Sequence, residues 1–395
     1  IRTPEYLSKD ILDEDFVVVF KIFHKVQIIL GSCRVEAKDQ FVTTPTRYQK
    51  AYTIFCILLT LVSNGLLLEL YYNQIRDGVI FNLSVFVIWY GFGTYLCLVI
   101  NARFFNGQDN AEFFIQMQKI DRLMGLDKVT DVNKILKRIN NSSLFTLLFA
   151  FFIMFLAECT NFNVMYITSA GAVYAQLTAM VELIYCSNLL VYFFLRLRFI
   201  NCIIKNHLSQ NKKKDKKLKR NIFSNRNIKK MAMKTHSFAT SDTHIYMKEL
   251  FDLFTMFQNL FRFQLFIFCL KLVFGSMCAF GIILFSIQRN VSNYSFVFIL
   301  IVYSVIDIFI AIFIGLRLQL FFAEVKETKR ISIAVMAEYP TGQLREKARK
   351  MLKMADETPP RLSIYDMYNM DAGIFLSIFS LITSLIVTLL QFAFL

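Results

Sequence analysis

Five polar side chains stand at helical spacing near the C-terminus, in a stretch without Asp, Glu, Lys, Arg or His. They are Ser377, Ser380, Ser384, Thr388 and Gln391. At about 100° per residue they fall within about 80° of one helix face, whereas Thr383 lies off that face. A polar stripe on a membrane helix faces water or other helices rather than lipid. The stripe is therefore a candidate pore lining for ions, and close helix packing is the alternative explanation.

The composition is that of an integral membrane protein. Hydrophobic residues make up 56% of the 395 residues and charged residues only 18%, against about 25% charged residues in soluble proteins. The four His and eight Cys are dispersed, without the spacing of a metal site or a redox motif. We therefore expect no cofactor, no metal and no enzymatic activity, with the cysteines acting as small core residues.

Seven apolar segments are long enough to cross a bilayer, which takes about 20 residues in a helix. They cover about residues 51–71, 79–100, 144–166, 171–195, 264–287, 295–316 and 372–395. The sequence thus predicts an all-α membrane protein with seven transmembrane helices. The expected segments are an N-terminal segment (1–50), helices 1–4 with their 2–3 loop (51–195), a long basic loop and an amphipathic helix at 246–261 (together 196–263), helices 5–6 (264–316), a polar anchor segment (317–370) and the terminal helix (371–395).

The basic residues orient these helices. Of the 44 Lys and Arg, 41 lie in the N-terminal segment and in the 2–3, 4–5 and 6–7 loops. Because cytoplasmic loops carry the excess of basic residues, the N-terminus is expected in the cytoplasm and the C-terminus outside. The net charge of +15 is then a topology signal that can also contact anionic membrane lipids, and no nucleic-acid partner is expected. A cytoplasmic N-terminus also argues against a G-protein-coupled receptor.

An inverted seven-span chain of this length, with a long 4–5 loop and a polar-faced last helix, resembles the insect gustatory receptors. That family typically ends in Thr-Tyr, five mostly apolar residues and Gln-Phe. Here the ending runs from Ser384-Leu385 to Gln391-Phe392 and closes on Ala-Phe-Leu, which also looks like moth and butterfly members. Ser384 is a mild departure from the family pattern, and Leu385 in place of Tyr is a larger one.

The resemblance implies a homotetrameric, ligand-gated, non-selective cation channel in the plasma membrane of a sensory neuron. The seventh helices would line a central pore, and the cytoplasmic ends of helices 4–7 would form an anchor domain. Gln391 and Phe392 would form the gate, with Thr388 one turn inside and Ser384 further along the stripe. A hydrophobic ring can close a pore by dewetting. A small-molecule tastant, more in keeping with a bitter plant compound than with a sugar, would enter a pocket among helices 2–6.

The sequence does not mark that pocket, so the candidates are polar and aromatic groups at a suitable depth. They are Trp89, Tyr90, Glu158, Asn161, Tyr174, Gln176, Glu182, Tyr303 and Asp307. Ionisable groups within membrane helices are costly and often functional, but the three acids could equally be hydrogen-bonded structural groups. Lys271, also within a span, is expected to extend toward the cytoplasm.

Two other classes of function stay open. An odorant-receptor-type subunit of the same superfamily would need a co-receptor to conduct. A secondary transporter or membrane enzyme would need inverted repeats, Gly- or Pro-broken helices, or a catalytic set, and none of these is evident in the sequence.

Overall fold

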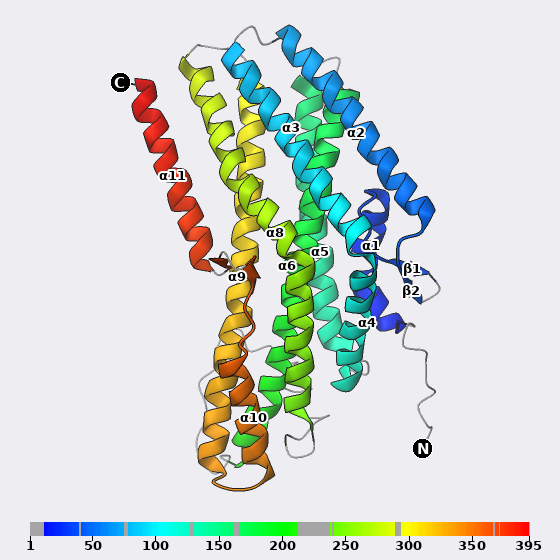
Figure 1. Cartoon of the computed structure of the whole chain (residues 1–395), viewed down its shortest axis with the longest axis vertical. Helices are drawn as coiled ribbons and strands as arrows, with labels where there is room; N and C mark the ends of the chain where they lie inside the picture. The colour runs from blue at the N-terminus through cyan, green and yellow to red at the C-terminus, as the bar shows by residue number, and fades with distance from the viewer. Residues whose placement is uncertain are drawn as a thin grey trace.

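The computed structural model is an elongated bundle of long helices (Figure 1). It describes residues 12–38, 41–74, 78–126, 130–161, 166–211, 238, 241–288, 294–365, 368–370 and 372–394. Within these residues, six helices are long and apolar enough to cross a membrane, and a shorter apolar stretch covers Leu376–Thr388 of the last helix. These apolar segments form helices because a backbone in lipid must satisfy all its hydrogen bonds internally, as an α-helix does.

The helices follow the order that the sequence predicts. The six spanning helices are α2 (Arg47–Gln74), α3 (Gly78–Ile100), α5 (Thr130–Asn161), α6 (Tyr166–Asn211), α8 (Thr243–Gln288) and α9 (Tyr294–Glu338), and the terminal helix is α11 (Ala372–Phe394). The other helices are α1 (Glu14–Ile29), the π-helix η1 (Asn101–Phe105), α4 (Gly107–Leu123) and α10 (Gln343–Glu357). The all-α fold class is therefore confirmed.

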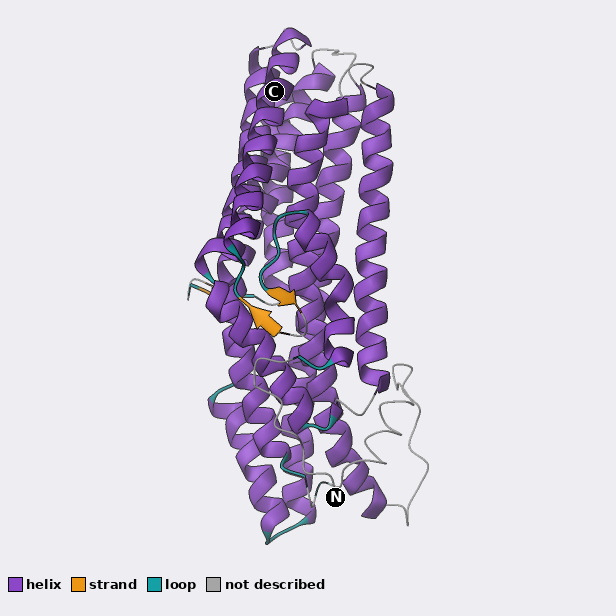
Figure 2. Cartoon of the chain, turned by 90° about the vertical axis from the view of Figure 1, so that its right-hand side faces the viewer, coloured by secondary structure: helices purple, strands orange, loops and turns teal. Residues whose placement is uncertain are grey.

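Two small antiparallel hairpins accompany the helices, and they lie near the middle of the long axis in Figure 2. Strand β1 (Glu36–Lys38) pairs with β2 (Phe41–Thr43), with Ala37 opposite Val42. Strand β3 (Ser363–Ile364) pairs with β4 (Tyr368–Asn369), with Ile364 opposite Tyr368. The first hairpin follows α1, and the second directly precedes α11.

Helices α6, α8 and α9 are 46, 46 and 45 residues long. At about 1.5 Å per residue each is about 69 Å long, more than twice the roughly 30 Å of a hydrocarbon core. Their lower halves in Figure 1 therefore continue beyond the membrane, where α8 and α9 pack with α10. The polar sequence directly after residues 195 and 316 is continuous helix, as α6 runs to Asn211 and α9 to Glu338. The composition of the basic run at 211–220 predicts disorder; apart from Asn211, the last residue of α6, this run lies outside the described residues.

Phenylalanines fill the core where the three long helices meet. Phe193 of α6, Phe254 and Phe257 of α8 and Phe321 of α9 are all fully buried. The Phe254 and Phe321 rings stack with their centroids 4.7 Å apart, and Phe193 meets Phe254 edge-on at 5.2 Å. Such aromatic pairs add about 0.5–1.5 kcal/mol beyond the area that they bury. This aromatic cluster packs α6, α8 and α9 against one another.

Helices α2 and α6 cross closely at Gly171. Its backbone N–H donates to Ser63 Oγ over 3.2 Å, and a Cβ added there would overlap the Ser63 side chain. Gly171→Ala is therefore expected to destabilise the protein by about 1–3 kcal/mol, the usual cost of overpacking, and to lower the melting temperature in detergent. Gly65→Ala is the control, because a Cβ there meets no atom within 4 Å. Equal melting temperatures for both variants would contradict the close crossing.

Candidate functional site

Helix α11 presents its polar stripe away from the rest of the subunit. Its buried residue, Ile382, and its partly buried neighbours pack on the core. The stripe residues Ser377, Ser380, Ser384, Thr388 and Gln391 are all exposed. At about 100° per residue the five stripe residues lie about 120–180° around the helix from Ile382. The stripe is therefore opposite the packed face. Packing within one subunit therefore does not account for the stripe.

Three hydroxyl groups of α11 donate to backbone carbonyls of their own helix. Ser377 Oγ donates to the carbonyl of Gly373 over 3.0 Å, and Thr388 Oγ1 donates to that of Ser384 over 2.9 Å. Thr383, off the stripe, does the same toward Phe379 over 2.8 Å. The hydroxyl protons are thereby satisfied, and the oxygen lone pairs stay available to water or a cation. Phe392 belongs to α11, but its side chain is outside the described part of the structure.

Two of the candidate ligand residues, Gln176 and Asp307, meet at a buried lysine. The Lys271 Nζ of α8 lies 2.9 Å from Asp307 Oδ1 of α9 and 2.9 Å from Gln176 Oε1 of α6. Lys271 is 7% exposed and Asp307 is 9% exposed. The expectation that Lys271 extends toward the cytoplasm is wrong. Its ammonium group instead binds the Asp307 carboxylate and the Gln176 amide within the bundle. The Lys271 ammonium thereby links three spanning helices, through an ion pair with α9 and a hydrogen bond with α6.

Aromatic candidates flank this ion pair on separate helices. Tyr90 of α3 meets Phe274 of α8 edge-on, with ring centroids 6.1 Å apart. Tyr303 of α9 packs on Phe151 of α5 at 6.3 Å. Phe274 follows Lys271 by three residues on α8, and Tyr303 precedes Asp307 by four residues on α9, so each lies about one helical turn from a member of the ion pair.

The remaining candidates lie elsewhere or are not described. Tyr174 packs against Tyr95 with centroids 6.1 Å apart, and its hydroxyl is buried without a hydrogen-bond partner among the described residues. Trp89 is 42% exposed and contacts Phe92. Glu158 and Asn161 lie in α5, outside the residues whose side chains the structure describes.

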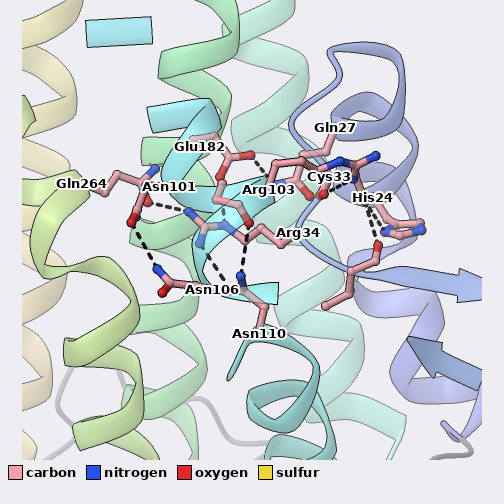
Figure 3. Close-up of polar contacts among 12 residues, drawn as sticks. His24, Gln27, Cys33, Arg34, Asn101, Arg103, Asn106, Asn110, Glu182 and Gln264 are labelled. Atoms are coloured by element: carbon pink, nitrogen blue, oxygen red, sulfur yellow. Dashed lines mark hydrogen bonds and ion pairs between the residues drawn. The ribbon is translucent and has the colours of Figure 1, made fainter. Parts of the chain in front are cut away.

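Glu182 is not near this ion pair but is the centre of a second polar cluster, drawn in Figure 3. It is fully buried and pairs with Arg34 of the N-terminal segment, with Nε and Oε2 2.9 Å apart. Gln27 of α1 donates to the other carboxylate oxygen over 2.8 Å. Arg34 also donates to Gln264 Oε1 over 2.6 Å and to Asn110 Oδ1 over 3.4 Å. These contacts favour the structural reading of Glu182.

A second buried guanidinium, Arg103 of η1, extends this cluster. It donates to the backbone carbonyl of Cys33 and, over 3.3 Å, to Gln49 Oε1. Burial raises the pKa of the Cys33 thiol to about 12. Burial, with a contribution from the charge of Arg103, lowers the pKa of His24, whose Nδ1 lies 3.2 Å from Cys33 Sγ. The thiol and the imidazole are therefore both neutral near pH 7.

Sequence reasoning found the acid of this second cluster and missed its basic partner. Arg34 lies in a segment of mixed polarity, and nothing in its neighbours distinguishes it from the other basic residues there. The available signal was Glu182 itself, because a carboxylate fully within a membrane helix needs a cation or a hydrogen-bond donor. That requirement predicts a partner without saying which residue it is.

Comparisons with known proteins agree with this architecture. The family model described as 7tm chemosensory receptor matches residues 20–395, whereas none of the curated proteins matches the chain. The solved insect olfactory receptor OR5 from Machilis hrabei is 11% identical and has a TM-score of 0.64, covering 96% of this chain and 100% of that one. Its complex with eugenol has the same identity and coverage and a TM-score of 0.58.

These two structures share the fold of this chain, and the insect chemoreceptor fold expected from the sequence is confirmed. The family match covers nearly the whole chain, and it identifies a family of receptors rather than of enzymes. The chain belongs to the 7tm chemosensory receptor family.

Proposed function

We propose that the protein is a gustatory-type receptor that works as a tastant-gated, non-selective cation channel. Four copies of the chain would surround a central pore lined by α11. The observation that carries the proposal is the exposed polar stripe of α11, which lies opposite the face that packs on the subunit. Ser384, Thr388, Gln391 and Phe392 are the residues assigned to the pore and gate. The N-terminus would lie in the cytoplasm of a sensory neuron, and the C-terminus outside.

The ligand would bind among α3, α5, α6, α8 and α9 of each subunit. Tyr90, Gln176, Tyr303 and Asp307 are the candidates best supported by their contacts around Lys271. An aromatic and hydrogen-bonding lining suits plant secondary compounds. The olfactory receptor of similar fold was solved with eugenol, a neutral phenol, which is in keeping with a small organic ligand here.

Gating requires the ligand to bind the open state more tightly than the closed state. A shift from about 1% to about 99% open takes about 5.5 kcal/mol in total. Spread over four pockets, that is about 1.4 kcal/mol each, or a tenfold difference in affinity. A few contacts that improve on opening can supply it.

Expression of this chain alone in cells that lack chemoreceptors tests the proposal. We expect calcium influx and whole-cell cation currents when plant alkaloids, phenols or glycosides are applied. Gln391→Ala is expected to change the leak current, the gating or the ion selectivity, because the amide lies on the exposed stripe. Currents from Gln391→Ala that match the parent in all three respects would contradict the pore assignment.

An odorant-receptor-type subunit is the second candidate function. Leu385 in place of the Tyr that is typical of gustatory receptors favours it, since this position is part of the ending that distinguishes the gustatory branch. Such a subunit would conduct only with a co-receptor. Surface expression without current, followed by ligand-evoked current when a co-receptor is added, would decide for this alternative. A secondary transporter would instead give slow coupled flux without unitary conductance.

A further inference from the structure

Stability alone does not account for the buried ion pair between Lys271 and Asp307. Their side chains are 8% and 12% exposed, and both lie within membrane helices. Taking two charges out of water costs about as much as their attraction returns, so a well-packed apolar pair would hold the helices equally well. Charged groups retained at such depth mark functional sites by default.

The ion pair retains unused hydrogen-bonding capacity. An ammonium has three donors, and the contacts with Asp307 and Gln176 use two of them. A carboxylate has about four acceptor positions, and Lys271 occupies one of those on Asp307. Among the described residues, one donor of Lys271 and several acceptor positions of Asp307 therefore have no partner, and they lie beside each other at the ion pair.

The space beside the ion pair suits an aromatic ligand. Gly275 follows Lys271 by one helical turn on α8, and a Cβ added there would meet no atom within 4 Å. Gln176 is only partly buried. Phe274, three residues after Lys271, contacts Tyr90, and Tyr303, four residues before Asp307, contacts Phe151. The arrangement combines a polar point, open volume and aromatic surface, as small-molecule sites do.

We infer that Lys271 and Asp307 together recognise a hydroxyl group, and that they select neutral hydroxylated ligands over charged ones. This inference rests on the proposed function. A hydroxyl group can donate to the Asp307 carboxylate and accept from the Lys271 ammonium at once. A protonated amine would compete with Lys271 for the carboxylate, and a carboxylate ligand would compete with Asp307. Either charged ligand leaves one buried charge without its partner, which is costly.

The experiment compares matched aromatic alcohols and phenols, their methyl ethers, their amine analogues and their carboxylate analogues on cells that express the chain. Agonists are expected among the hydroxylated compounds, and each methyl ether is expected to need at least tenfold more compound for half-maximal current. The double variant Lys271→Met/Asp307→Leu removes both charges and their hydrogen-bonding groups together and leaves no unpaired ion. It is expected to shrink the preference for the hydroxyl compound over its ether to within threefold, at unchanged surface level.

The outcomes separate this inference from the proposed function. Currents evoked chiefly by amines or carboxylates, or a hydroxyl preference that survives in the double variant, overturn the inference and leave the channel proposal standing. A chain that reaches the surface but conducts with no compound, alone or with a co-receptor, overturns both. The swapped variant Lys271→Asp/Asp307→Lys keeps one charge of each sign, and it is expected to retain the hydroxyl preference better than the double neutral variant.

Discussion

Glu182→Ala is expected to remove most of the folded receptor, because it leaves a buried arginine without its partner. The side chains of Arg34 and Glu182 are 2% and 0% exposed. Breaking one partner of such a pair costs about 3–5 kcal/mol, which lowers the ratio of folded to unfolded protein by a factor of more than about 100. Surface biotinylation and the melting temperature of the detergent-solubilised protein measure the effect.

Two controls distinguish loss of the ion pair from loss of side-chain volume. The double variant Arg34→Met/Glu182→Leu leaves no unpaired charge, so it is expected to recover much of the surface level. Glu249→Ala breaks the pair with Lys119, whose side chain is 50% exposed while that of Glu249 is 29% exposed, and is expected to cost at most about 1 kcal/mol. Similar losses for Glu182→Ala and Glu249→Ala would show that the ion pair of Glu182 does not stabilise the fold.

The same ion pair shows how far the sequence could predict the structure. The spanning helices were predictable from apolar segments of the right length, because the backbone of a segment in lipid must form its hydrogen bonds within a helix. The amphipathic pattern at 246–261 predicted the lower half of α8, whereas the continuous lengths of α6 and α9 were not predicted, since their lower halves carry the charges typical of loops. No Pro interrupts these lower halves, and the packing of α6 on α9 and of α9 on α10 favours helix over loop.

The candidate site was predictable to a lesser degree. The polar stripe of α11 follows from residue spacing alone, whereas its exposed position opposite the packed face comes from the structure. Asp307 and Gln176 stood out as polar groups within spans, whereas their meeting at Lys271 depends on how α6, α8 and α9 are rotated about their axes. Rotation is set by side-chain packing along whole helices, and spacing within one helix does not determine it.

A lysine at Thr388 is expected to abolish cation currents, whereas an aspartate at the same position is expected to preserve or increase them. Four copies would place four like charges around the path of the ion. At about 5 Å and the dielectric constant of water, each charge contributes about 0.8 kcal/mol, and four contribute about 3 kcal/mol. This energy corresponds to a factor on the order of 100 in local cation concentration. Lysine lowers the cation concentration in the pore by this factor, and aspartate raises it. Reversal potentials in asymmetric salt would measure the selectivity.

The opposite signs at Thr388 provide the main control, because any damage from a charge in the membrane affects both variants alike. Thr383 provides a second one, since it is exposed on α11 but lies off the stripe. Lysine and aspartate at Thr383 are expected to give currents that do not differ by sign. If the two Thr388 variants shared one reversal potential and one current density, the stripe would be a packing surface between subunits. A change that depends on the sign of the charge at Thr388, and not at Thr383, would instead identify the stripe as the wall of the ion path. Only charges beside a conducting pore have opposite effects on the cation current when their signs are opposite.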